Sequence, residues 1–309
     1  MDKISKSIKQ VYSSENIGYI MIFAAGSLWG TIGFFVKMLS VTGASSSLIA
    51  FIRLFVGSCV LVPVMLFYGG SEMFKIDKKG LVPCILLGVL SQALFNYCYN
   101  TSIEGVGVAM GSILLYMAPA FVCIMSRLIF KENIGTQKIL ALILNIFGCF
   151  LMVTGGNISN LKISAAGIAF GVAAAFLYSL VTIIGKITSG NIHPFTVVFY
   201  SFLFGWITLG IFTAPWKHAA AVAGAEFWIY AFGYGLIPTV GSYLLYMGGL
   251  NKRIEISRAP VIASVETVVA TWIGVLVFRE RLGLINVFGI VCLLISIAVM
   301  NMKFSNEEI

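Results

Sequence analysis

The sequence carries little charge for its length. Only 10% of its 309 residues are Asp, Glu, Lys or Arg, whereas a soluble globular domain carries roughly 25%. Hydrophobic residues make up 59% of the chain. Because the hydrocarbon core of a bilayer rejects charge and accepts apolar side chains, this balance excludes an ordinary soluble domain and indicates an integral membrane protein.

The motifs of metal and disulfide chemistry are also missing. There is no CxxC pair, and His193 and His218 fall in predicted loops without partners at ligand spacing. All six cysteines lie inside apolar runs, where a small hydrophobic residue packs well. They are Cys59, Cys84, Cys98, Cys123, Cys149 and Cys292. We therefore expect no disulfide framework, no metal site and no cofactor.

Signatures of catalysis and of nucleic-acid binding are absent as well. The chain has no GxxxxGK[ST] loop, no Ser/His/Asp arrangement and no HExxH motif, which leaves ATP-driven or hydrolytic chemistry unsupported and predicts that the protein is not an enzyme. The net charge of +8 would suit a nucleic acid only if the basic residues formed one stripe. They form short clusters between apolar runs instead, so we expect no nucleic-acid partner.

What the sequence does have is a series of long apolar runs. A membrane span needs about 20 mostly apolar residues, and ten runs qualify. They are Ile17–Met38, Ser46–Tyr68, Leu81–Ile103, Val106–Phe130, Thr136–Thr154, Ala166–Ile187, Pro194–Ala214, Phe227–Leu250, Ala259–Phe278 and Leu284–Met302. The predicted fold class is an all-α integral membrane protein with ten transmembrane helices, the first of them uncleaved.

The distribution of Lys and Arg between the loops predicts the orientation. With the N-terminus in the cytoplasm, 14 of the 20 basic residues fall on the cytoplasmic side, five on the other, and Arg53 alone inside a span. Basic residues are enriched in cytoplasmic loops. We therefore expect a multi-pass protein of the cytoplasmic (inner) membrane, with a cytoplasmic segment 1–16 and a cytoplasmic tail 303–309.

The two halves of the chain repeat each other. Leu128–Glu132 (LIFKE) is echoed by Leu276–Glu280 (LVFRE), and Phe51–Gly57 (FIRLFVG) aligns with Phe199–Gly205 (FYSFLFG), both at an offset of 148 residues. Each half holds five spans, so the second half must enter the membrane upside down. Inverted repeats allow a central site to face either side in turn, which makes transport the favoured function.

On these residues each half resembles the EamA-type repeat of the drug/metabolite transporter superfamily. The matching features are Trp29 and Tyr178 in the first helix of each half, Arg53 in the second helix, and Ala118–Pro119 in the fourth. The resemblance implies two inverted five-helix repeats, 17–155 and 165–302, around a cavity lined mainly by helices 1, 3, 4, 6, 8 and 9. The second half departs from the pattern, since Glu266–Thr267 stands where the family often has Glu-Pro.

Glu266 is the one carboxylate well inside a predicted span. An isolated charge at that depth costs at least about 2.5 kcal/mol, so Glu266 must face a partner, a wet cavity or a proton. We consider two roles for Glu266. It could be a ligand for a substrate cation or a proton carrier, or it could be structural, through an ion pair with Arg53 or a hydrogen bond to the end of a broken helix. Arg53 could extend to the external interface or clamp a substrate carboxylate. Since the family that the chain resembles has an arginine here across many substrates, the resemblance implies a structural or gating role instead.

Two predicted helices carry polar faces. Gln92, Asn96 and Tyr99 recur at helical spacing in the third span, and Thr239, Ser242, Tyr243 and Tyr246 in the eighth. Polar groups at membrane depth must face protein or water, although they can also simply join helices, and Tyr246 could belong to an interfacial belt. The predicted substrate-binding residues are Trp29, Gln92, Asn96, Tyr99, Tyr116, Tyr178, Tyr243 and Glu266, and the predicted coupling or gating residues are Arg53, Glu266 and Pro119.

A cavity with aromatic walls and one carboxylate suits an organic cation, through cation–π contacts, or an amino acid whose amine meets Glu266. The sequence leaves these two substrates open, together with a proton or another coupling ion and a monomer or a dimer. The predicted function is secondary active transport by alternating access. The alternative is a membrane-embedded enzyme or regulator acting on a lipid-linked substrate, but the sequence lacks the cluster of acidic, His or Arg residues near one interface that such an enzyme needs. A channel or receptor is a third class, and the inverted repeat favours alternating access over a continuous pore.

Small residues four apart predict close helix crossings at Gly26/Gly30, Gly107/Gly111 and Gly167/Gly171, because small side chains let two backbones approach. Pro119 and Pro260 lie within or at the start of spans, where a missing backbone donor can kink a helix.

Overall fold

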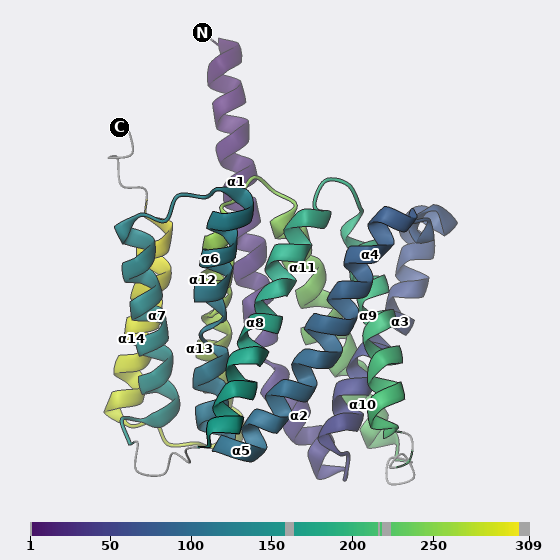
Figure 1. Cartoon of the computed structure of the whole chain (residues 1–309), viewed down its shortest axis with the longest axis vertical. Coiled ribbons are helices and arrows are strands. Elements are labelled where there is room, and N and C mark those ends of the chain that lie inside the picture. The colour runs from purple at the N-terminus through teal and green to yellow at the C-terminus, as the bar shows by residue number, and fades with distance from the viewer. Residues whose placement is uncertain (1, 158–163, 216, 218–223, 303–309) are drawn as a thin grey trace.

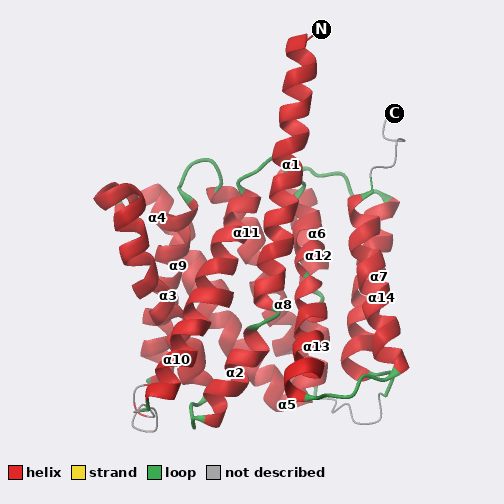
Figure 2. Ribbon diagram, turned by 180° about the vertical axis from the view of Figure 1, so that it is seen from behind, coloured by secondary structure: helices red, strands yellow, loops and turns green. Residues whose placement is uncertain are grey.

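The computed structural model describes residues 2–157, 164–215, 217 and 224–302, with side chains from residue 14 onward. All regular structure in these ranges is helical (Figures 1 and 2). The elements are α1 (Asp2–Trp29), α2 (Ile32–Val41), α3 (Ser46–Gly69), η1 (Gly70–Phe74), α4 (Lys78–Leu86), η2 (Leu87–Leu94), α5 (Phe95–Leu115), α6 (Ala118–Phe130), α7 (Thr136–Thr154), α8 (Ala165–Thr188), α9 (Pro194–Thr213), α10 (Ala225–Tyr234), η4 (Gly235–Gly241), α11 (Ser242–Leu250), η5 (Ile256–Arg258), α12 (Ala259–Ala263), α13 (Val265–Phe278) and α14 (Leu284–Asn301). The predicted tail 303–309, Lys162 and His218 lie outside the described residues.

These elements cross the bundle ten times, as predicted. Eight helices of the described chain are long and apolar enough to span a bilayer. The other two crossings are the fourth, which is the end of α5 continued by α6, and the eighth, which runs through α10, η4 and α11 (Figure 1). The first crossing consists of α1 and α2, the third of α4, η2 and the start of α5, and the ninth of η5, α12 and α13. Helix α1 begins and α14 ends at the same end of the bundle, which we call the terminal face. The other end is the opposite face.

The crossings begin where local chemistry favours a helix start. Ser45, Asp77 and Ser164 each precede a helix and accept a hydrogen bond from a backbone amide of its first turn. Such caps satisfy donors that have no partner within the helix. The caps therefore explain why α3, α4 and α8 start within a few residues of the predicted bounds.

The third and fourth crossings meet at a sharper bend than expected. The prediction ended the third span at Ile103, but the helix continues to Gly107, where φ is +84° and ψ is 164°. Glycine adopts this conformation without a Cβ clash. Nothing lies within 4 Å of a Cβ placed on Gly107, so the prediction of a close helix contact is wrong for Gly107, whose role is to turn the chain. The other member of that predicted pair, Gly111, does lie close to the third crossing, because a Cβ there would be 3.0 Å from the Ile103 side chain.

The close helix contacts predicted at the other two glycine pairs, Gly26/Gly30 and Gly167/Gly171, are confirmed. A Cβ on Gly26 would lie 2.4 Å from the Ala263 carbonyl oxygen, and one on Gly30 would lie 2.7 Å from the Glu266 carbonyl oxygen. Similarly, a Cβ on Gly171 would lie 2.4 Å from Leu114. Helix α1 therefore packs directly on the backbone of the ninth crossing, and α8 packs on α5.

The repeat is visible in irregular features that both halves share at the same offset. One wide π-helical turn occurs in the third crossing at Leu87–Leu94, and another occurs in the eighth at Gly235–Gly241. Lys131 after α6 and Arg279 after α13 both have φ near +57°, at 57° and 56°. Helices α7 and α14, which end the two halves, lie side by side and start at opposite ends of the bundle (Figures 1 and 2). The halves are therefore inverted copies.

Candidate functional site

Three crossings are interrupted near the middle of the bundle. Helix α1 ends at Trp29, α5 and α6 are separated at Tyr116–Met117, and α12 and α13 are separated at Ser264. Pro119 in the first turn of α6 accounts for the second break, because proline has no amide to continue the α5 ladder. Tyr116 and Ser264 are also equivalent positions of the repeat, 148 residues apart.

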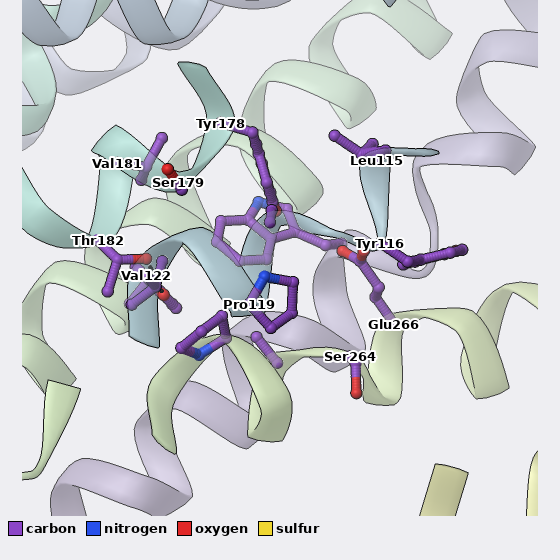
Figure 3. A pocket seen from close by; sticks show the side chains of 15 residues that line it. Leu115, Tyr116, Pro119, Val122, Tyr178, Ser179, Val181, Thr182, Ser264 and Glu266 are labelled. Atoms are coloured by element: carbon purple, nitrogen blue, oxygen red, sulfur yellow. Dashed lines mark hydrogen bonds between the residues drawn. The ribbon is translucent and has the colours of Figure 1, made fainter. Parts of the chain in front are cut away.

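A small cavity lies beside these breaks. The volume open to the centre of a water molecule is about 30 Å³, which is room for roughly two waters. Figure 3 shows Glu266 and Tyr178 reaching the cavity from different sides, with Tyr116 beside the carboxylate. The lining residues are Trp29, Leu115, Tyr116, Ala118, Pro119, Val122, Tyr178, Ser179, Val181, Thr182, Tyr246, Pro260, Ala263, Ser264 and Glu266. A metabolite therefore needs the surrounding helices to move apart before it can enter.

The carboxylate of Glu266 has no hydrogen bond or ion pair to any described residue. It stands at the first turn of α13 and is half-buried at the cavity wall. The ion pair with Arg53 that the sequence suggested is not formed. That hypothesis is wrong because Arg53, with 7% of its surface exposed, is bound elsewhere, and Glu266 is directed at the cavity. The carboxylate is thus available to a ligand, water or a proton.

Aromatic rings form one wall of the cavity. The Trp29 ring centroid lies 5.0 Å from that of Tyr246 and 6.4 Å from that of Tyr178. The Tyr246 hydroxyl is 2.7 Å from the Thr182 hydroxyl, so this ring is held in place. An array of rings around a single carboxylate can bind a positively charged or aromatic group.

Several predicted binding residues lie behind this wall instead of lining it. Gln92 is fully buried, accepts a 3.1 Å hydrogen bond from Arg53 and donates a 2.8 Å hydrogen bond to the Tyr243 hydroxyl. Asn96 donates to the Gln92 carbonyl oxygen, and the Tyr99 hydroxyl is 3.2 Å from the Ser112 hydroxyl.

Tyr243 connects this polar layer to the cavity wall, with its ring centroid 5.5 Å from that of Trp29. The structure therefore brings Trp29, Tyr116, Pro119, Tyr178 and Glu266 together at the cavity and leaves Gln92, Asn96, Tyr99, Tyr243 and Arg53 in the layer behind it.

Sequence reasoning missed four polar lining residues. The sequence places Tyr246 in a polar face or an interfacial belt, and it gives no site role to Ser179, Thr182 or Ser264. Thr182 lies one helical turn after Tyr178 and so shares its face, which is a usable signal. Ser264 immediately precedes the break in the ninth crossing, where it also accepts a 2.7 Å hydrogen bond from Asn145.

Comparison with known proteins places the chain in a family. The model of the EamA-like transporter family matches residues 16–154 and again residues 165–302. An uncharacterized transporter of Archaeoglobus fulgidus is 29% identical over 276 residues, which cover 88% of this chain and 92% of that protein. The uncharacterized inner membrane transporter YicL of Salmonella typhimurium is 25% identical, with 94% of this chain and 96% of that protein covered.

One more distant relative and one solved structure are also similar to this chain. The pseudopaline exporter CntI of Pseudomonas aeruginosa is 23% identical, over 74% of this chain and 76% of that protein. A crystal structure with 15% identity superimposes with a TM-score of 0.74, covering 92% of this chain and 96% of that one; it supports the fold alone. Since the family model covers both halves, this chain is a membrane transporter of the EamA-like family, within the drug/metabolite transporter superfamily, and not an enzyme.

Proposed function

We propose that the protein is a secondary active transporter that moves a small organic metabolite with a positively charged group across the cytoplasmic membrane by alternating access. The observation that carries this proposal is the Glu266 carboxylate, which faces the cavity without a partner among the described residues. A cation–carboxylate contact inside a low-dielectric bundle is stronger than the same contact in water. The substrate is then an amino acid, bound through its amine, or an organic cation.

The surrounding residues support this assignment. Trp29, Tyr116, Tyr178 and Tyr246 supply ring faces for the apolar or cationic part of the substrate. Thr182 and Ser264 supply hydroxyl groups on the same wall. Arg53, Gln92 and Tyr243 form a polar layer that holds the rings from behind, and Asn96 and Tyr99 extend it.

The inverted halves support alternation. Breaks at equivalent positions, Tyr116 and Ser264, lie on the cavity, and discontinuous helices at the repeat interface are the places where carriers bind substrates. Pro119 fixes one of these breaks and serves as a gating element. We further propose that both termini, segments 1–16 and 303–309, lie in the cytoplasm, and that the repeats are 17–155 and 165–302.

A ligand screen followed by counterflow tests the proposal. The purified protein is heated with individual amino acids and quaternary ammonium compounds, because a ligand that binds only the folded state raises the unfolding temperature. Liposomes loaded with an unlabelled hit should then accumulate the labelled hit transiently. A hit that equilibrates without such an overshoot would indicate a channel, and chemical conversion of the hit would indicate an enzyme.

A further inference from the structure

The end of the fourth crossing is tied to the start of the ninth at the terminal face. After α6 the chain turns through Lys131, and the carboxylate of Glu132 accepts hydrogen bonds from the backbone amides of Ile256, at 2.6 Å, and Ser257, at 3.0 Å. These amides open the ninth crossing, where no preceding turn offers a partner. The contact joins the two inverted halves on one side of the cavity.

A polar cluster reinforces the closure at this face. Glu255 pairs with Arg258, and its carboxylate lies 3.3 Å from the Lys138 ammonium. The Glu255 amide also donates to the Tyr19 hydroxyl at 3.2 Å. Below this cluster, α6 packs on η5 and α12. At the terminal face, therefore, the fourth and ninth crossings meet.

The equivalent carboxylate at the opposite face is unengaged. Glu280 follows Arg279 as Glu132 follows Lys131, and its amide donates to the Gly274 carbonyl oxygen at 3.1 Å, as that of Glu132 donates to Ser126 at 3.4 Å. The Glu280 carboxylate is exposed, lies over its own Gly274, and has no hydrogen bond or ion pair to a described residue. The main-chain turn is the same, but the contact across the repeat interface is missing.

The repeat identifies the amides that Glu280 would reach. The counterparts of Ile256 and Ser257, 148 residues earlier, are Val108 and Ala109 at the start of the fourth crossing. Val108 is 65% exposed here. The residue before it, Gly107, has φ of +84°, whereas its counterpart Glu255 has φ of −75°. Glycine can adopt both conformations, so the start of the fourth crossing can change to the geometry that the ninth has now.

We propose that Glu132 and Glu280 are alternating latches, each binding the first backbone amides of the crossing that it faces only while its own side of the transporter is closed. The proposal rests on the alternating access proposed above. In each transition, the glutamate on the closing side gains two charge-assisted hydrogen bonds, and the glutamate on the opening side loses two of the same kind. The exchange keeps the two end states close in free energy, which a carrier needs in order to populate both.

The latch predicts opposite effects for two similar variants. Glu132→Ala should favour the state open at the terminal face, and Glu280→Ala the state open at the opposite face. The readout is a cysteine placed at Leu115 on the cavity wall, in a protein whose six native cysteines are replaced. A membrane-impermeant thiosulfonate is applied to vesicles of each orientation. We expect the rate of labelling from the opened face to rise and the rate from the other face to fall. The ratio of the two rates should change by about tenfold or more, because that is the effect of losing a hydrogen bond to a charged group.

Controls on both faces separate the latch from general effects of charge. Glu72→Ala and Glu226→Ala remove exposed carboxylates near the terminal and opposite faces and should leave both labelling rates unchanged. Glu132→Gln, whose amide oxygen still accepts a weaker bond, should shift labelling in the same direction by less, and it serves if Glu132→Ala does not fold.

Two results would overturn the proposal in different ways. In the first, the reporter protein with both glutamates intact is labelled from both faces, but Glu132→Ala and Glu280→Ala leave the ratio of the two labelling rates unchanged or shift it in the same direction. The latch is then wrong, and alternating access stands. If every form is labelled from a single face only, alternating access itself is wrong, and the latch fails with it.

Discussion

Glu266 shows how one side chain can define a site within an otherwise apolar bundle. Its neighbours on the cavity wall are rings and hydroxyl groups, and Arg53 is bound to Gln92 in the layer behind. None of the described residues that line the cavity is basic. In the proposed function, the positive charge beside Glu266 is therefore supplied by the substrate or a proton.

Replacing this carboxylate by its isosteric amide tests that role. Glu266→Gln removes a charge without removing volume, and no described partner is left unpaired, so we expect folding to be retained. Transport of a cationic substrate should fall about tenfold or more, since a charged hydrogen bond contributes about 1.5–3 kcal/mol. Uptake into proteoliposomes at several pH values measures the effect. Unchanged uptake with an unchanged pH profile would remove Glu266 from the site, and Glu72→Gln is the control.

Trp29 carries the largest ring system among the residues that line the cavity, so its removal should weaken binding. Cation–π contacts contribute about 0.5–2 kcal/mol, and we therefore expect Trp29→Ala to raise the Kd of an ammonium ligand roughly 2- to 30-fold. Titration of the purified protein with a ligand from the thermal-shift screen measures this. Trp228→Ala, on the exposed face of α10, should leave the Kd as it is. Equal effects of the two substitutions would contradict the assignment.

At the scale of whole elements, the interruptions of the helices carry the geometry of the site. Gly107 bends the chain between the third and fourth crossings, and the breaks at Tyr116 and Ser264 open onto the cavity. Hydropathy detects a span by its length and composition. It is insensitive to one turn of altered backbone, which explains why the spans were predictable from hydropathy and the breaks were not. Only Pro119 gave a separate signal for one of the breaks.

Gly107→Ala tests the strained turn directly. The position has open space around it but a φ of +84°, so an added methyl group meets no neighbour and acts only through the backbone. Such a conformation costs a non-glycine residue about 1–3 kcal/mol. We expect a lower unfolding temperature in detergent. Gly33→Ala, in helix α2 with equally open space, should be neutral or slightly stabilising. A lowered unfolding temperature in both variants would indicate a different cause.

Across the whole molecule, the number of crossings and the inverted repeat were predictable from the sequence. Both follow from patterns that extend over many residues, namely the series of apolar runs and the motifs repeated at an offset of 148 residues. The candidate site was predictable only in part. Trp29, Tyr178 and Glu266 line the cavity, but Gln92 and Tyr243 do not. Polar residues on one face of a helix indicate that this face is turned away from lipid. Whether each polar group then faces a cavity or another side chain depends on how several helices pack, which the spacing within one helix does not determine.

The polar cluster at the terminal face predicts a pH dependence of the whole fold. Burial raises the pKa of Glu255, but its hydrogen bond and charge contact with Arg258, together with the charge of Lys138, outweigh burial and hold that pKa below its ordinary value of 4.5. A lowered pKa stabilises the folded state above the ordinary value, and the contribution is lost as pH falls. The unfolding temperature should therefore decline below about pH 4.5, and Glu255→Gln should reduce that decline. An identical pH profile in the variant would show that Glu255 is uncoupled from folding.

The wide turns at Leu87–Leu94 and Gly235–Gly241 have a historical consequence. A shared irregularity at the same place in both halves is inherited more simply than acquired twice, so the single-copy ancestor already had it. An ancestor with an odd number of crossings that paired with an inverted copy of itself would have had to insert in both directions. A balanced distribution of Lys and Arg between its loops would have allowed this, because the bias of these residues sets the direction of insertion.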